Sequence, residues 1–170
     1  DKIVIEPKSA FGTGHHATTA LCLTVLSELA ESGRVKAGQH FLDLGTGSGV
    51  LGIGCCKSGL TGEGYDIDML AVENAIENRG INGIEGFEVG LGSIDALEGR
   101  TYDLVLANIL ARPLIELSQR IVWACKPGAC LVLSGLLEIQ ADSVEEAYKA
   151  QCLPKPRRVI DGEWCALVWE

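Results

Sequence analysis

Short apolar runs alternate with amphipathic segments along the chain, and this alternation predicts strands and helices in turn. Strands are predicted over residues 40–45, 62–68, 86–91, 102–110 and, after a turn, within 126–135; the first and fourth are apolar runs, whereas the second ends in acidic residues. Helices are predicted over residues 17–31, 49–58, 69–79, 112–125 and 138–150; apolar residues recur three or four positions apart in 17–31, 69–79 and 112–125, and small residues predominate in 49–58. Near the C-terminus, Asp161-Gly162 is typical of a hairpin turn between two further strands.

This order of elements predicts an α/β fold with a doubly wound, mixed sheet of seven strands and a C-terminal antiparallel hairpin. The run over residues 102–110 is continuously apolar, as expected for a strand that is covered on both faces. Sheets of this kind bind their ligands beyond the carboxyl ends of the strands. Candidate functional residues are therefore expected directly after the strands.

Composition and charge narrow the class of protein. The chain has 170 residues, which suits one domain with a sizeable core, and a formal net charge of −9. Such acidity argues against direct binding of nucleic acid; it is compatible with a basic partner or an amine, and equally with a role in solubility. No apolar run is long enough to cross a bilayer and no secretory signal is visible, so we expect a cytoplasmic protein without membrane contact.

Cysteine usage favours neither a disulfide framework nor a zinc site. The chain has seven cysteines, an odd number, without a C-x-x-C pair. Most of them lie in apolar runs, as buried and reduced thiols do. The adjacent His15 and His16 could begin a metal site, but the sequence places no third ligand beside them. We therefore expect no metal.

A glycine-rich stretch, LDLGTGSG over residues 42–49, follows the first strand and opens a helix. Its glycines allow a sharp turn and a close approach of the backbone to a ligand, although a tight strand-to-helix turn alone would explain them. The spacing is G-x-G-x-G, and Val50 occupies the position of the last glycine in the dinucleotide fingerprint. Asp43, inside the strand, must be satisfied by loop amides or by a ligand's ammonium group.

Polar residues also follow the second and fourth strands. Asp66 lies 19 residues after Gly47, where a carboxylate can accept hydrogen bonds from both hydroxyls of a ribose. The alternative is helix capping, for which Asp68 is equally well placed. Asn108 lies at the end of the fourth strand, and its amide can orient an amino group and a carboxylate; the alternative is a turn-forming asparagine.

Taken together, these residues resemble the class I S-adenosylmethionine-dependent methyltransferases, which have a Rossmann-like fold. The stretches AFGTGHHATT, LDLGTGSGVLGI, GYDIDMLAVENAIEN, DLVLANILARPLIEL and KPGACLVLSGLL, with DGEWCALV near the end, resemble the PrmA family more closely. Members of that family methylate the eleventh protein of the large ribosomal subunit. The resemblance covers nearly the whole chain and keeps the order of the motifs.

The resemblance implies S-adenosylmethionine as cofactor, no metal, and a site built around the loop and the strand ends. In the family, the AFGTG stretch covers the methionine end of the cofactor and a threonine of the first helix holds its amino-acid part; from the residues alone, Thr18 or Thr19 could instead cap that helix. Asn108 is the implied catalytic residue. The implied cofactor-binding residues are Phe11, Gly12, Thr13, Thr19, Asp43, Gly45, Thr46, Gly47, Asp66, Ile67, Ser93 and Asn108.

The implied reaction is methyl transfer to lysine side-chain and/or N-terminal amines of a large-subunit ribosomal protein. The stretch Asn108-Ile109-Leu110-Ala111 lacks the asparagine-proline-proline-aromatic tetrad of many methyltransferases that act on nucleic-acid amines or glutamine. Residues 1–170 are expected to form a single catalytic domain, without the family's N-terminal substrate-recognition domain. The alternatives are a methyltransferase of another protein or of a small-molecule amine, and a non-catalytic or nicotinamide-binding module; Val50 argues against nicotinamide.

Overall fold

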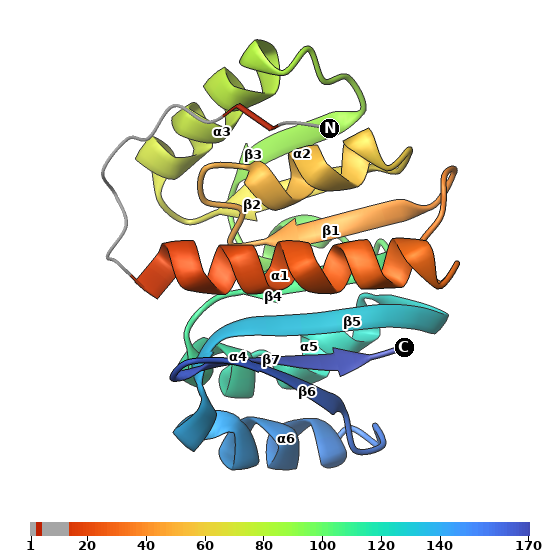
Figure 1. Ribbon diagram of the computed structural model, residues 1–170, viewed down its shortest axis with the longest axis vertical. Helices are drawn as coiled ribbons and strands as arrows, with labels where there is room; N and C mark the ends of the chain where they lie inside the picture. Colours follow the sequence, from red (N-terminus) through yellow and green to blue (C-terminus); the bar gives the residue numbers. More distant parts are fainter. Residues whose placement is uncertain (1–2, 5–13) are drawn as a thin grey trace.

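The structure, a computed structural model, describes residues 3–4 and 14–170. Within this part a single sheet of seven strands lies between helices, in the strand order β3-β2-β1-β4-β5-β7-β6 (Figure 1). The elements are α1 (Gly14–Glu31), β1 (His40–Leu44), α2 (Val50–Lys57), β2 (Thr61–Asp66), α3 (Met69–Ile81), β3 (Phe87–Leu91), η1 (Ile94–Leu97), β4 (Tyr102–Asn108), α4 (Ala111–Glu116), α5 (Ser118–Trp123), β5 (Cys125–Leu137), η2 (Glu138–Gln140), α6 (Ala141–Lys149), β6 (Arg157–Asp161) and β7 (Trp164–Trp169).

The sheet is mixed, as the sequence predicts. Strands β1 to β5 pair in parallel, whereas β7 pairs antiparallel with both β5 and β6. The carboxyl ends of β1, β2 and β4 therefore meet at one edge of the sheet, because neighbouring parallel strands end on the same side. The predicted α/β class and the C-terminal antiparallel hairpin are confirmed.

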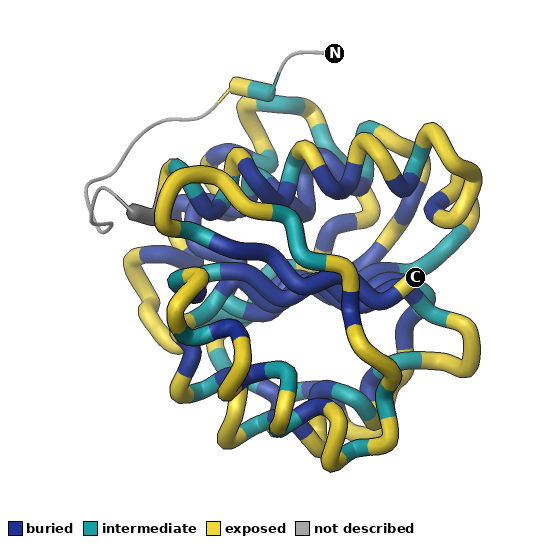
Figure 2. The backbone as a smooth tube through the Cα atoms, turned by 60° about the horizontal axis from the view of Figure 1, so that its bottom comes forward, coloured by how far each residue is buried: buried dark blue, intermediate teal, exposed yellow. Residues whose placement is uncertain are grey.

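Helices cover both faces of the sheet and bury its strands (Figure 2). One apolar cluster joins α1 and α2 to the sheet and includes Val25, Ile53 and Leu106. A second cluster, on the opposite face, joins α4, α5 and α6 to the sheet and includes Leu114 and Val144. No helix of the described residues is both long and apolar enough to span a membrane.

The first helix begins earlier than its apolar pattern predicts. α1 starts at Gly14, so Thr18 and Thr19 lie within it and neither caps it. His15 and His16 also belong to this helix, not to a loop. The capping alternative for the two threonines is therefore wrong, which leaves their side chains for other contacts.

The predicted helix over residues 112–125 is two helices, α4 and α5, which meet at Leu117. The Tyr148 hydroxyl donates a hydrogen bond of 2.8 Å to the carbonyl of Leu114, which would accept the Ser118 N–H in a continuous helix. Tyr148 lies far along the chain, so local periodicity could not predict the interruption. Residues 138–140 likewise form a short 3-10 turn before α6.

The C-terminal turn is shifted by one residue from its predicted position. Asp161 belongs to β6, and Gly162 and Glu163 connect the two strands. Gly162 has a φ of 60°, which a glycine adopts at little cost.

Candidate active site

The glycine-rich turn after β1 is held in a left-handed backbone conformation. Gly45, Gly47 and Gly49 have φ angles of 74°, 57° and 83°. A Cβ added to Gly45 would lie 2.5 Å from Ile109 Cγ2, so the turn also needs glycine for a close approach. The amides of Gly45 and Thr46 donate to the carbonyl of Tyr65 over 2.8 and 2.9 Å, which ties the turn to β2.

Asp43 lies beneath this turn and is completely buried. Its Oδ2 accepts hydrogen bonds from Thr46 Oγ1 at 2.6 Å and from the Gly52 amide at 3.1 Å. Its Oδ1 has no hydrogen-bond partner among the described residues. Burial raises the pKa of Asp43 to about 6, against the opposing effect of the bonds from Thr46 and Gly52. Asp43 therefore stabilises the turn through one oxygen, while its other oxygen is buried without a partner among the described residues.

The raised pKa of Asp43 makes the stability of the ligand-free protein depend on pH. The folded protein binds this proton more tightly than the unfolded chain, whose pKa is near the ordinary 3.8, so ionisation of Asp43 opposes folding. We compare the free energy of unfolding of the natural chain with that of the Asp43→Asn variant. As the pH rises from about 4 to about 6, the value for the natural chain should fall relative to the variant by up to about 1.4 kcal/mol per pH unit. Urea titrations of both proteins across this range measure the difference, and a pH-independent difference would contradict the assignment.

Asp66 and Asp68 divide two tasks at the end of β2. Asp66 Oδ2 accepts the Gly47 amide at 3.0 Å, and its Oδ1 accepts the Asp68 amide at 3.0 Å. The Asp68 side chain caps α3 by accepting the Leu70 amide at 3.0 Å. Asp68 thus supplies the helix cap, and Asp66 joins the glycine-rich turn to the end of β2.

Two further predicted residues lie beside Asp66. Ile67 is 80% exposed, which is unusual for a large apolar side chain and leaves it available for a flat apolar ligand. The carbonyl of Asp66 accepts the Gly92 amide at 2.9 Å, which places Ser93, at the start of η1, next to the end of β2. The Ser93 amide itself donates to Asp95 Oδ1 at 3.3 Å.

Asn108 joins the end of β4 to α1. It is 9% exposed, and its Nδ2 donates to Thr19 Oγ1 at 3.3 Å. On the next strand, Ser134 Oγ donates to the carbonyl of Thr18 at 3.4 Å. The structure thus brings Thr19 and Asn108 together, although 89 residues separate them.

The remaining predicted residues cannot be placed. Phe11, Gly12 and Thr13 lie outside the described residues. Gly14 begins α1, and His16 is exposed on it. The part of the chain that the structure describes contains no group of three His, Cys, Asp or Glu side chains placed to hold a metal ion.

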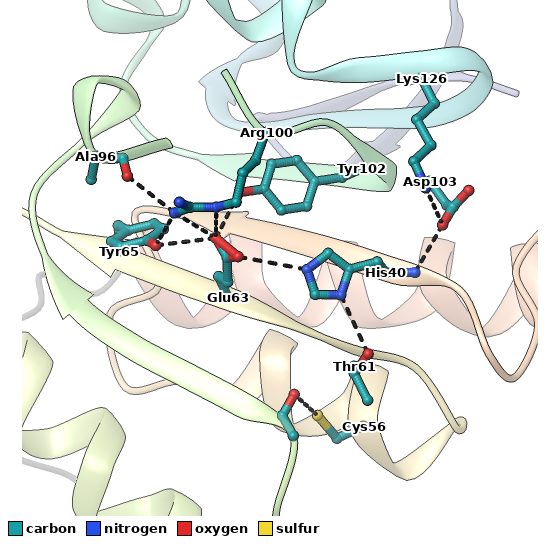
Figure 3. A network of polar contacts seen from close by, with 11 residues as sticks. His40, Cys56, Thr61, Glu63, Tyr65, Ala96, Arg100, Tyr102, Asp103 and Lys126 are labelled. Carbon is teal, nitrogen blue, oxygen red and sulfur yellow. Dashed lines mark hydrogen bonds and ion pairs between the residues drawn. The ribbon is translucent and has the colours of Figure 1, made fainter. Parts of the chain in front are cut away.

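A polar network that the sequence does not predict lies on the opposite face of β2 (Figure 3). Glu63 Oε1 accepts hydrogen bonds from Tyr102 at 2.6 Å, from Tyr65 at 3.1 Å and from Arg100 Nε at 3.1 Å. Arg100 also donates to the carbonyl of Ala96 in η1 at 3.1 Å. The network therefore joins β2 to the segment that contains Ser93. Its only signal in the sequence is a charged residue inside the second predicted strand.

This edge of the sheet combines groups that suit one composite ligand. A buried carboxylate oxygen of Asp43 suits an ammonium group, and the carboxylate of Asp66 suits hydroxyls. The exposed Ile67 suits an aromatic ring, and the amide of Asn108 can bind a second polar molecule. An amino acid joined to a nucleoside has these features in this order.

Comparisons with known proteins agree with this description. The family model described as "Ribosomal protein L11 methyltransferase (PrmA)" matches residues 2–170. Ribosomal protein L11 methyltransferases from Myxococcus xanthus and Caulobacter sp. are 45% and 40% identical to the chain; each match covers 96% of the chain, and 55% and 57% of the relative. The chain thus spans little more than half the length of these relatives.

Solved structures support the same fold. A ribosomal protein L11 methylase from Lactobacillus delbrueckii subsp. bulgaricus superposes with a TM-score of 0.85 at 29% identity, covering 98% of this chain and 83% of that one. A methyltransferase from Pyrococcus furiosus has a TM-score of 0.74 at 16% identity, covering 96% and 86% of the two chains. The fold is that of the class I S-adenosylmethionine-dependent methyltransferases, and the chain belongs to the PrmA family of ribosomal protein L11 methyltransferases.

Proposed function

We propose that the chain transfers methyl groups from S-adenosylmethionine to lysine side-chain and/or N-terminal amines of ribosomal protein L11. Membership of the PrmA family supports this reaction and substrate, and the cytoplasm is the expected location. We assign catalysis to residues 1–170 as one domain. Recognition of the ribosomal protein is assigned to the part of the longer relatives that lies outside the match.

The residues at the edge of the sheet fit this cofactor. The buried Asp43 Oδ1 matches the ammonium group of its amino-acid part, together with Thr19 from α1. Asp66 would hold the ribose hydroxyls, while Ile67 and Ser93 would flank the adenine. Phe11, Gly12 and Thr13 stay predicted cofactor residues.

S-adenosylmethionine would supply a methyl group that its sulfonium already activates, so the protein's task is to position the amine. With its Nδ2 donating to Thr19, Asn108 can accept a hydrogen bond from the substrate amine at its carbonyl oxygen. A lysine amine has an ordinary pKa of about 10.4 and must lose its proton before transfer. Desolvation beside the apolar end of β4 lowers that pKa and favours the neutral amine.

The single observation that carries the proposal is the pair of carboxylates at the glycine-rich turn, the buried Asp43 and the half-buried Asp66, because their chemistry suits two different parts of the cofactor. Calorimetric titration with S-adenosylhomocysteine tests it. We expect binding in the micromolar range, which the Asp66→Ala change weakens by about 10- to 100-fold, because a charge-assisted hydrogen bond contributes about 1.5–3 kcal/mol.

Asp68→Ala is the matched control, since it removes a neighbouring carboxylate whose bond is to the α3 amide of Leu70. It should lower the melting temperature but leave the affinity nearly unchanged. NAD should not bind. Equal losses of affinity in the Asp66 and Asp68 variants would contradict the role given to Asp66, and tight binding of NAD would contradict the function.

A further inference from the structure

Three asparagines follow one another at intervals of four residues along α3 and its C-cap: Asn74 and Asn78 lie within the helix, and Asn82 directly follows it. Asn78 is completely buried, and its Nδ2 donates to the carbonyl of Ser48 at 2.9 Å. Ser48 lies inside the glycine-rich turn, between Gly47 and Gly49. The side chain of Asn78 therefore reaches the turn from behind, on the side that a cofactor would not occupy.

The bond to Ser48 fixes more than one atom of the turn. The Ser48 carbonyl and the Gly49 amide share one rigid peptide plane, so Asn78 orients both. The Gly49 amide donates to the carbonyl of Thr46 at 2.8 Å. A Cβ added to Gly49 would lie 3.0 Å from Ala75 Cβ, which shows how closely α3 packs against the turn. A small shift of α3 would therefore move the turn directly.

The next asparagine, Asn82, binds the backbone of Val4 near the start of the sequence. Asn82 Oδ1 accepts the Val4 amide at 2.9 Å, and Asn82 Nδ2 donates to the Val4 carbonyl at 2.6 Å. The same Nδ2 lies 2.8 Å from the carbonyl of Asn78. One side chain thus satisfies both backbone groups of Val4, as a neighbouring strand would. Figure 1 shows residues 3–4 lying beside α3.

Ile3 brings the segment at residues 3–4 into contact with α2, the helix that follows the glycine-rich turn. It packs against the apolar cluster that contains α1 and α2, and a Cβ added to Gly54 would lie 3.6 Å from Ile3 Cδ1. Residues 3–4 therefore contact α2, which begins directly after the turn, and α3, which supports it from behind. This arrangement is not needed to cap α3, because the Asn82 amide already bonds to the Asn78 carbonyl.

We propose that Asn82 and Asn78 form a relay that couples the seating of residues 3–4 to the conformation of the glycine-rich turn, and thereby to its affinity for cofactor. Both are positioning residues, since neither touches the expected position of the cofactor. The link to affinity rests on the proposed function, whereas the link to the conformation of the turn does not. The segment at residues 3–4 thus influences the conformation of the glycine-rich turn.

Hydrogen exchange measured by mass spectrometry on the ligand-free chain tests the relay. Asn82→Ala should accelerate exchange about 3- to 10-fold both at Val4 and in peptides that cover residues 45–49. Val4→Pro removes the N–H that Asn82 accepts without altering α3, and it should accelerate exchange in the turn in the same way. Glu73→Ala, an exposed change on the same helix, is the control and should alter neither peptide.

Titration with S-adenosylhomocysteine separates positioning from general stability. Asn82→Ala and Asn78→Ala should each weaken binding about 3- to 10-fold, and the double variant should be no weaker than the more severe single one, because the two act in series. The relay is wrong when Asn82→Ala accelerates exchange at Val4, yet both Asn82→Ala and Val4→Pro leave exchange at residues 45–49 unchanged. It is also wrong when the two asparagine changes weaken binding independently. A natural chain that fails to bind at all contradicts the proposed function, while the exchange data still decide the relay.

Discussion

Replacing Gly135 by alanine should destabilise the protein by about 3 kcal/mol or more, whereas the same change at Gly128 should cost about 1–2 kcal/mol. The two glycines lie on β5 with similar left-handed φ angles of 88° and 79°. A Cβ at Gly135 would lie 2.4 Å from the carbonyl oxygen of Ile109, but one at Gly128 meets nothing within 4 Å. Both variants lose stability because alanine disfavours a left-handed φ angle, but only Gly135→Ala also brings a Cβ against Ile109. The difference between the two losses therefore measures the cost of that close contact.

The contact at Gly135 bears directly on the site. Ile109 follows Asn108, and Asn108 is paired with Ser134 across the two strands. Moving Ile109 away from β5 would displace the Asn108 side chain from Thr19. We therefore expect Gly135→Ala, but not Gly128→Ala, to weaken cofactor binding or block methyl transfer, in addition to its larger effect in urea unfolding. Equal losses of stability in the two variants would show that the backbone at Ile109 yields easily.

Much of the fold could be predicted from the chain because its elements are locally encoded. Apolar runs indicate several of the parallel strands, and the position of Asp66 at the end of β2, with Asp68 two residues later, indicates both a candidate ribose ligand and the alternative helix cap. The structure assigns the cap to Asp68. The start of α1 and the break between α4 and α5 were predicted wrongly. At this break the Leu114 carbonyl accepts a hydrogen bond from Tyr148, which lies 34 residues further along the chain.

For the candidate site, the sequence predicts types of residue but not the contacts between them. Nothing local indicates that Asn108 meets Thr19, that Asn82 binds the backbone of Val4, or that Asp43 keeps one oxygen free of partners among the described residues. Each of these depends on how the sheet brings distant segments together. The polar network at Glu63 is the largest omission, since its partners Arg100 and Tyr102 lie 37 and 39 residues away.

The Glu63→Ala change should destabilise the protein by about 3 kcal/mol. Glu63 is only 8% exposed and accepts bonds from two tyrosine hydroxyls and from Arg100; Tyr102, the closest of the three, is completely buried. His40 adds an ion-pair contact of 3.6 Å to Glu63 Oε2 and stacks on the Tyr102 ring (Figure 3). Removal of the carboxylate leaves these donors without their shared acceptor, which costs more than the loss of any one bond.

The pH dependence distinguishes this network from simple packing. Burial disfavours the ionised form of Glu63, but the bonds from Tyr102, Arg100 and Tyr65 outweigh it and lower the pKa below the ordinary 4.5. The stabilisation is therefore complete above that pH and is lost as the pH falls through the lowered pKa. We expect the difference in unfolding free energy between the natural chain and Glu63→Gln to shrink below about pH 4.5. Glu88→Gln, an exposed change at the paired position of β3, is the control and should show no such trend. If the difference in unfolding free energy between the natural chain and Glu63→Gln stays constant down to pH 3, the charge of Glu63 does not stabilise the fold.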